Sequence, residues 1–150
     1  MTRMGDETVQ ALEWAYGRLA LDQGLADALG IPLASVDDRV WPDVAPGDTK
    51  GPWVTIAAAV ATDRAAVGPA DRLSTVVTLD VKAVTSARTY TTLAPVARAI
   101  YDALHARTND PLAHGGWMLH AKRTGGIQYP EKADGIDYRH LGHTFQVEIN

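Results

Sequence analysis

The sequence predicts an α+β domain, in which a mostly antiparallel sheet of four to five strands carries two main helices packed on one face. Segments 8–20 and 86–107 place apolar residues three and four positions apart, which is typical of amphipathic helices. Several other segments alternate apolar and polar residues, which is typical of half-buried strands. The helices do not alternate one for one with the strands, and this argues against a doubly wound parallel sheet. The length of 150 residues is that of one domain, 1–150.

The first third of the chain predicts a helix, a helical turn and a short edge strand. The helix is expected over Thr8–Ala20, and its buried stripe is expected to consist of Val9, Leu12, Tyr16 and Leu19. Leu25–Leu29 predicts a further turn that Gly30 closes. The segment Arg39–Asp43 predicts a short extended piece. Because Pro42 lacks a backbone N–H, this piece belongs at a sheet edge or a strand end.

The next segments predict a long hairpin with an exposed tip. Trp53–Val60 is expected to be a strand, because aromatic and β-branched residues begin it, and a loop follows over Thr62–Arg72. The second strand, Leu73–Ala83, is expected to place alternate residues on one face, namely Leu73, Thr75, Val77, Leu79, Val81 and Ala83. Charged residues flank the tip, where they form either a solvated surface or a contact site: Asp63, Arg64, Asp71 and Arg72.

A second amphipathic helix is expected between residues 86 and 107. Its apolar stripe consists of Tyr90, Leu93, Ala97, Ile100, Tyr101 and Leu104. Pro95 lies inside this stripe and removes one backbone hydrogen bond, so the helix either kinks there or begins only a turn earlier. Asn109–Pro111 is expected to end the helix.

The C-terminal part of the chain predicts two strands separated by an exposed loop. The strands are expected over Trp117–Ala121 and Leu141–Ile149. The second strand has the clearest alternation, and its inward residues should be Leu141, His143, Phe145, Val147 and Ile149. Tyr129–Gly135 is expected to be a loop, and it contains the charged pair Glu131 and Lys132.

Charge and composition exclude several classes of protein. The formal net charge of −4 makes the chain a poor candidate for gripping a phosphate backbone. Residues 1–48 hold nine acids and three bases, whereas residues 49–150 hold nine acids and eleven bases, so one end of the domain could present an acidic face. The absence of cysteine excludes disulfides and thiolate sites. The longest uncharged apolar stretch, 51–62, is shorter than the about 20 residues that span a membrane.

The sequence contains no recognisable catalytic, cofactor or metal site. It lacks the glycine-rich phosphate-binding motifs and the nucleophile elbow of hydrolases. His140 and His143 fall on opposite faces of a strand, so they cannot bind one metal together. His143 shares the apolar face with Phe145 and is expected to be a hydrogen-bonded core residue. The carboxylates of Asp80 and Glu148 fall on the solvent side of strands, without a sign of desolvation.

The ordered pattern of short motifs resembles the tail terminator, or tail completion, proteins of long-tailed bacteriophages. The resemblance spans residues 9–149. Its main motifs are the Leu25–Gly30 helix end, the stretch Arg39–Pro46 (RVWPDVAP), Gly51–Val54 (GPWV), Val76–Ala83, Ala97–Leu104 and Thr144–Ile149. The most telling part is the stretch Arg39–Pro46 together with the downstream Pro52–Val54.

This resemblance implies a structural role rather than an enzymatic one. Family members form a hexameric ring that caps the finished tail tube, stops its polymerisation and provides the joint to the head connector. The implied partners are therefore further copies of the chain, the tail tube protein and the head–tail connector protein, with DNA passing through the lumen without specific binding. The implied location is the head-proximal end of the virion tail, after assembly in the host cytoplasm, with no cofactor and no membrane.

Two other functions remain open on the sequence alone. One is a head-closure or connector-adaptor protein of a phage neck, and the other is a small-molecule enzyme or ligand-binding domain. The latter would need a deep pocket with converging polar groups. If the chain forms a ring, the tip at 61–72 and the loop at 129–137 are expected to contact neighbouring subunits or the tube.

Overall fold

The computed structural model of the protein describes residues 6–46, 51–65 and 72–150. Asp71, one of the predicted tip residues, lies outside these ranges. The helices are α1 (Glu7–Ala20), α2 (Gln23–Leu29), the 3₁₀ helix η1 (Leu33–Arg39) and α3 (Ala94–Leu104). The strands are β1 (Val40–Pro42), β2 (Trp53–Ala65), β3 (Arg72–Thr85), β4 (Arg107–Pro111), β5 (Trp117–Ala133) and β6 (Ile136–Ile149). None of the described helices is long and apolar enough to cross a membrane.

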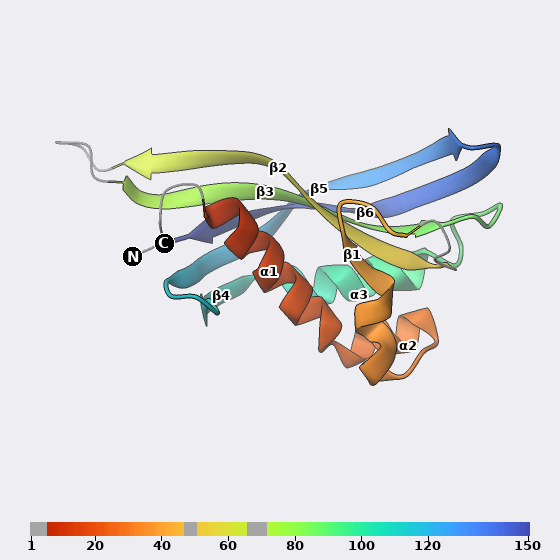
Figure 1. The fold of residues 1–150 in the computed structure, drawn as a ribbon, viewed down its shortest axis with the longest axis horizontal. Coiled ribbons are helices and arrows are strands. Elements are labelled where there is room, and N and C mark those ends of the chain that lie inside the picture. The colour runs from red at the N-terminus through yellow and green to blue at the C-terminus, as the bar shows by residue number, and fades with distance from the viewer. Residues whose placement is uncertain (1–5, 47–50, 66–71) are drawn as a thin grey trace.

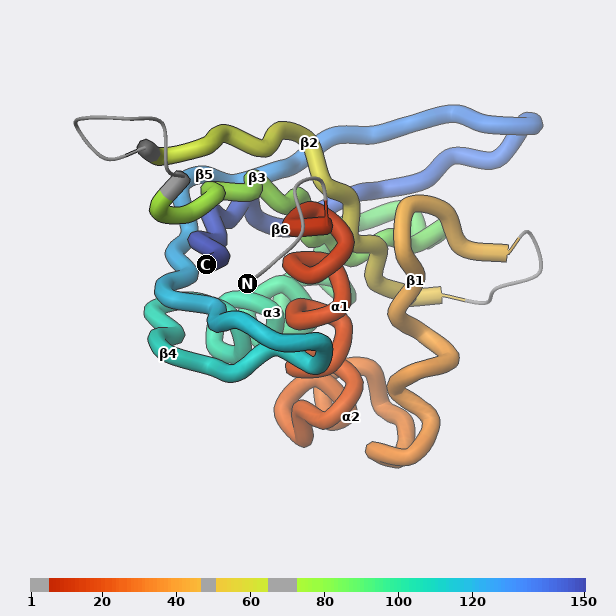
Figure 2. The backbone as a smooth tube through the Cα atoms, turned by 60° about the vertical axis from the view of Figure 1, so that its left-hand side comes forward, coloured from red at the N-terminus to blue at the C-terminus, as the bar shows by residue number. Residues whose placement is uncertain are grey.

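A twisted six-stranded sheet forms the body of the protein, with the strand order β1-β2-β3-β6-β5-β4. Only β1 is parallel to its neighbour, and the other pairs are antiparallel. The hairpins β2–β3 and β5–β6 extend toward opposite ends of the sheet, while the helices cover one face (Figures 1 and 2). The predicted α+β class is therefore confirmed, but the sheet is mixed and has six strands instead of four or five.

The core lies between the helices and the middle of the sheet. Alternate residues of β3 and β6 face the helices because side chains on a strand point to opposite faces in turn. The largest fully buried side chains include Phe145, Leu79, Ile149, Leu19, Leu25, Ile100, Leu104 and Met118. The alternation predicted for β3 is confirmed from Thr75 onward, whereas Leu73 is 59% exposed.

Helix α1 matches its predicted position, but its buried face matches the prediction only in part. The side chains that it buries are Glu7, Gln10, Ala11, Trp14, Ala15 and Leu19. In contrast, Val9 is 53% exposed and Tyr16 is 36% exposed. The stripe prediction is confirmed for Leu19 and for the partly buried Leu12, and it is wrong for Val9 and Tyr16 because it ranked large apolar residues first. Ala11 and Ala15 instead form the buried face, and their small side chains permit a close approach of α1 to the sheet.

Helix α3 begins at Ala94, so Pro95 occupies its first turn and causes no kink. A proline is tolerated there because the first backbone N–H groups of a helix have no partner within the helix. The residues after α3 correct the sequence prediction, because Arg107–Pro111 is the edge strand β4 rather than a helix end followed by a loop. Asn109, at a φ of 55°, supplies a left-handed residue within this short strand.

The predicted loop at Tyr129–Gly135 is wrong for most of its length. These residues continue β5 to Ala133, and the register runs from Met118 opposite Ile149 to Ala133 opposite Ile136. The turn consists of Asp134 and Gly135, which both have positive φ, as a two-residue hairpin turn requires. Pro130 fits inside the strand because that part of β5 is an edge.

We expect Gly142→Ala to lower the free energy of unfolding by about 1–3 kcal/mol, because a side chain there overpacks the sheet. A Cβ at Gly142 would lie 2.2 Å from the carbonyl oxygen of Val81 and 2.4 Å from the Cα of Lys82. Gly125→Ala is the matched control, since nothing lies within 4 Å of its added Cβ. Urea unfolding should separate the two variants, and equal midpoints would contradict the close packing of β6 on β3.

Candidate functional site

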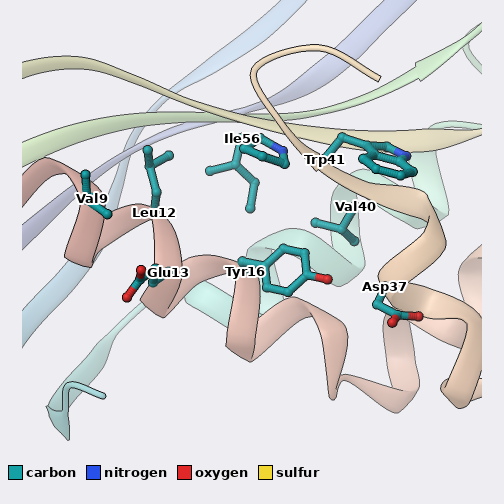
Figure 3. Close-up of a pocket in the computed structure, with 9 residues that line it drawn as sticks. Val9, Leu12, Glu13, Tyr16, Asp37, Val40, Trp41 and Ile56 are labelled. Atoms are coloured by element: carbon teal, nitrogen blue, oxygen red, sulfur yellow. The ribbon is translucent and has the colours of Figure 1, made fainter. Parts of the chain in front are cut away.

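An apolar groove lies between α1 and the β1 edge of the sheet (Figure 3). It has a volume of about 450 Å³. Its lining consists of Val9, Leu12, Glu13, Tyr16, Asp37, Val40, Trp41, Pro42 and Ile56. Val9 and Tyr16, which the sequence placed in the core, therefore form one wall of an open surface groove.

The groove has the chemistry of a contact site for an apolar group. Its walls are mostly aliphatic and aromatic, and the carboxylates of Glu13 and Asp37 are its acidic groups. The indole Nε1 of Trp41 is buried without a hydrogen-bond partner in the described part of the chain. Trp41 and Pro42 belong to the RVWPDVAP stretch, so the most telling motif of the sequence lies on this groove.

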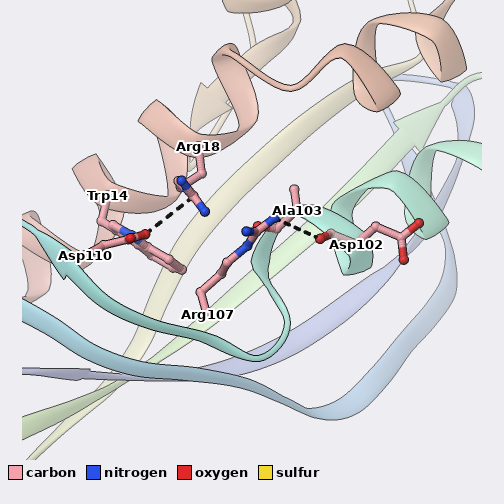
Figure 4. Close-up of polar contacts among 6 residues, drawn as sticks. All are labelled: Trp14, Arg18, Asp102, Ala103, Arg107 and Asp110. Carbon is pink, nitrogen blue, oxygen red and sulfur yellow. Dashed lines mark hydrogen bonds and ion pairs between the residues drawn. The ribbon is translucent and has the colours of Figure 1, made fainter.

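A polar clamp, formed by Trp14, Arg18, Arg107 and Asp110, joins α1 to β4 and β4 to the end of α3 (Figure 4). The indole Nε1 of Trp14 donates a hydrogen bond to Asp110 Oδ2 at 3.1 Å, and Arg18 Nε lies 3.5 Å from the same oxygen. Arg107 donates to the carbonyl oxygens of Ala103 at 3.0 Å and Asp102 at 3.4 Å. These contacts satisfy the C-terminal carbonyl groups of α3, so we assign the clamp a structural role.

The face of the sheet opposite the helices carries paired polar side chains. Ser74 Oγ donates a hydrogen bond to Glu148 Oε1 at 2.6 Å, and Arg64 Nη1 lies 3.5 Å from the same oxygen. Farther along the sheet, Thr144 Oγ1 donates to Asp80 Oδ1 at 2.8 Å. Asp80 and Glu148, the two candidate carboxylates of the sequence, therefore have separate partners and form no common acid–base pair.

The predicted contact residues do not converge on one site. Asp63 accepts a hydrogen bond from Thr75 Oγ1 at 2.8 Å, and its neighbour Arg64 points to the opposite face of β2. Only the backbone of Arg72, at the start of β3, is described. All of these residues lie at the end of the β2–β3 hairpin.

The other predicted pair lies at the far end of the sheet, on the β5–β6 hairpin (Figure 1). Glu131 Oε1 lies 3.5 Å from His140 Nε2, and Lys132 stands opposite Asp137. The sequence predicted the charged hairpin tip at 61–72, but it placed Glu131 and Lys132 in a loop and not near the end of a second hairpin. It missed the apolar groove, because Val9 and Tyr16 share helical spacing with the buried Leu19.

His140 is buried within a cluster on the β5–β6 hairpin. Its ring stacks on Tyr129 with a centroid distance of 4.3 Å, and the Tyr129 hydroxyl contacts Lys82 Nζ. The pKa of His140 is lowered from its usual value of 6.5, mainly by burial and then by the positive charge of Lys82. Glu131 opposes this shift. The cluster therefore favours the neutral imidazole.

His143 points to the helical face and connects the sheet to α3. Its Nε2–H donates a hydrogen bond to the carbonyl oxygen of Ala97 at 2.7 Å, and its Nδ1 accepts from Arg123 Nε at 2.8 Å. Burial lowers the pKa of His143 below 6.5. The predicted hydrogen bonding of His143 is thus confirmed, but its side chain is half-buried at the margin of the core and not within it. Within the described ranges, no group of three or more His, Asp or Glu side chains could hold a metal ion.

Comparison with known proteins finds a match in fold. The sequence matches no protein-family model, and no curated protein matches it either. Among solved structures, the chain is similar to one described as "Virion of native gene transfer agent (GTA) particle". The TM-score is 0.67 and the sequence identity is 20%, and the match covers 99% of this chain and 98% of that chain. The two chains therefore share one fold over nearly their whole lengths.

The lowered pKa values of His140 and His143 predict that acid destabilises the fold. Below pH 6.5 the unfolded chain binds more protons at these residues than the folded chain, so the free energy of unfolding falls as the pH decreases. This contribution to stability is fully present above pH 6.5, where both states hold neutral rings. His143→Gln, which keeps a donor for Ala97, should reduce the loss of stability between pH 7.5 and pH 5.5.

The measurement is urea unfolding of each variant at both pH values. His114→Gln is the control for the loss of an imidazole, since the His114 side chain is 75% exposed. A His143→Gln chain that loses as much stability on acidification as the His114→Gln chain would contradict the role of the buried ring.

Proposed function

We propose that this chain is a structural virion protein, which forms a ring that caps a phage tail tube and ends its polymerisation. The observation that carries the proposal is the shared fold with a virion chain over 99% of this chain, at a TM-score of 0.67. The motifs in residues 9–149 give independent support, because their order resembles that of tail terminator proteins. In this role the ring also provides the joint to the head connector.

The shape of the molecule suits a ring subunit. A closed ring uses a heterologous interface, so each subunit needs two different contact regions directed toward its two neighbours. The β2–β3 and β5–β6 hairpins lie at opposite ends of the sheet (Figure 2). The charged tip residues Asp63, Arg64, Asp71 and Arg72 then belong to one contact region, and Glu131 and Lys132 belong to the other.

The charge of the chain suits a ring that surrounds DNA. Each copy carries a formal charge of −4, so six copies carry about −24. Such a ring offers little neutralisation of phosphates, and DNA passes through the lumen without specific binding. The proposed partners are the tail tube protein on one face of the ring and the head–tail connector protein on the other. The role needs no catalytic residue, no cofactor and no membrane.

The decisive experiment is to produce particles without this chain and to measure tail lengths by electron microscopy. We expect tails of variable and excessive length that do not join heads, because nothing ends tube growth. Supplying the chain in trans should restore a single length. Tails of normal length in its absence would contradict the proposal.

Fractionation of complete particles separates this role from that of a neck protein. We expect the chain to stay with purified tails, at their head-proximal end, after heads and tails are separated. Recovery of the chain with the heads would instead support a head-closure or connector-adaptor protein. Native mass measurement should give six times 16.1 kDa for the assembled ring.

A further inference from the structure

Two long stretches of sheet edge have no described strand beside them. β1 pairs with β2 only at Val54, Thr55 and Ile56, which leaves the outer edge of residues 57–64 uncovered, here called the free β2 edge. β4 pairs with β5 only as far as Ala121, and Arg123 N–H donates a hydrogen bond to His105 Nδ1 at 3.1 Å. Residues 124–133 then have no described strand beside them, and they are here called the free β5 edge. Each edge presents a row of backbone N–H and C=O groups to its surroundings.

Most of the free β2 edge lacks the side chains that commonly prevent pairing, and its charged residues, Asp63 and Arg64, lie at one end. Natural edge strands carry charged residues or proline that keep other chains away. Residues 57–62 of β2 have the sequence Ala-Ala-Ala-Val-Ala-Thr, without charge or proline. Val60 is 58% exposed on this strand. Residues 57–62, which contain the bulge between Ala58 and Val60, are therefore a template for β-augmentation by another strand.

We infer that the free β2 edge of one copy pairs with the free β5 edge of the next copy, so that the subunits form one continuous antiparallel sheet. The inference rests on the proposed ring and specifies its subunit interface. Successive strands in the order β2-β3-β6-β5 alternate in direction. If the neighbouring copy has the same orientation relative to the ring axis, its β5 therefore runs antiparallel to the β2 of the first copy.

The register of the sheet fixes the offset between the two free edges. Ala61 lies in one cross-strand row with Val77, Val147 and Ala121. Gln128 lies at the centre of the free β5 edge, seven residues along β5 from Ala121. A bulge between Arg123 and Gly125 takes up one of these positions. The two free edges are thus offset by about six residues, or about 20 Å, along the strands.

This offset matches the strand tilt of a closed barrel. Four strands per copy at a spacing of about 4.8 Å span about 19 Å across the sheet. An offset of about 20 Å along the strands for every 19 Å of sheet width tilts the strands by about 45° from the ring axis. Strands in known barrels tilt by about 35–45°. Six such copies close a barrel with a backbone diameter of about 50 Å, which leaves room for a DNA duplex.

The backbone groups that make the contact can be named on β5. Alternate residues of a strand direct their N–H and C=O groups to the same edge. Pro130 lies opposite Arg139 in the ladder between β5 and β6. Because proline has no N–H to donate to that ladder, its nitrogen faces the free edge. Gln128, two residues earlier in the same register, therefore directs its N–H to the free β5 edge. Its side chain is exposed.

The same reasoning selects Ala61 on β2. The carbonyl oxygen of Ile56 accepts a hydrogen bond from Asp43 N–H beside β1, so Ile56 directs its backbone groups outward. Ile56, Ala58 and Ala61 stand opposite Val81, Leu79 and Val77, which are alternate residues of β3. Because a bulge lies between Ala58 and Val60, Ala61 continues the outward series. The Ala61 side chain is exposed.

Proline substitutions at these two positions test the pairing. Ala61→Pro and Gln128→Pro each remove one outward donor and place a ring on the edge, without removing a hydrogen bond of the monomer's own ladder. Analytical ultracentrifugation should give hexamers for the unmodified chain and monomers of 16.1 kDa for each proline variant. Ala61→Ser and Gln128→Ala, which keep the backbone donors, should still form hexamers.

Mixing the variants identifies the partners of each edge. Ala61→Pro keeps a functional β5 edge and Gln128→Pro keeps a functional β2 edge, so an equimolar mixture should form a dimer of the two chains and nothing larger. Circular dichroism and thermal unfolding of each monomer report whether the fold persists. If a proline variant does not fold, Ala61→Lys and Gln128→Glu, which place charges on the edges, replace the pair.

The outcomes separate this inference from the proposed function. Hexamers of both folded proline variants would overturn the pairing while leaving the ring in place. If Ala61→Pro fails to assemble but Gln128→Pro still assembles, two β2 edges pair with each other, and this result would also overturn the proposed pairing of β2 with β5. An unmodified chain that stays monomeric at every concentration overturns the pairing as well, because neither edge needs another protein. Tail length then decides the proposed function separately.

Discussion

The pairing of β3 with β6 is the constraint on which the rest of the fold depends. It is the join between the two hairpins in the described sheet, and its register runs from Thr75 opposite Ile149 to Thr85 opposite Arg139. Its helix-facing residues, such as Leu79 and Phe145, form the floor on which α1 and α3 dock. His143 attaches α3 to this floor through Ala97. A slip of one residue would turn every one of these side chains to the other face.

The position of α1 follows from small side chains and leaves a groove as its consequence. Ala11 and Ala15 allow the helix to pack closely over the sheet, and Trp14 then reaches Asp110 on β4. The larger residues Val9 and Tyr16 lie beside the contact instead of within it. The stable docking of α1 and the exposure of the apolar groove therefore have the same cause, because the helix turns its alanine face toward the sheet and leaves Val9 and Tyr16 beside the contact.

Local patterns in the sequence predicted the parts of the fold that local physics decides. The alternation around Phe145 and the helix closure at Gly30 depend on neighbours in the chain, and both predictions were correct. The length of β5 depends on β6, which supplies partners to residues such as Pro130 that disfavour a strand by themselves. The charged residues Asp63, Arg64, Glu131 and Lys132 were selected from the sequence by residue type alone. Their separation at opposite ends of the sheet depends on the long-range pairing of the strands, which local patterns do not predict.

Because the helices cover only part of the sheet, a long strand such as β5 has two halves with different packing constraints. In β5, Met118 and Ala121 are fully buried beneath the helices, whereas residues 130–132 near the turn are mostly exposed. Substitutions in the buried halves must preserve volume, but the outer halves need only preserve backbone geometry. One fold can then be encoded by sequences that are only 20% identical, as in the similar virion chain at a TM-score of 0.67. The exposed ends of the strands can therefore take up contacts with other molecules without any change to the packing at the centre of the fold.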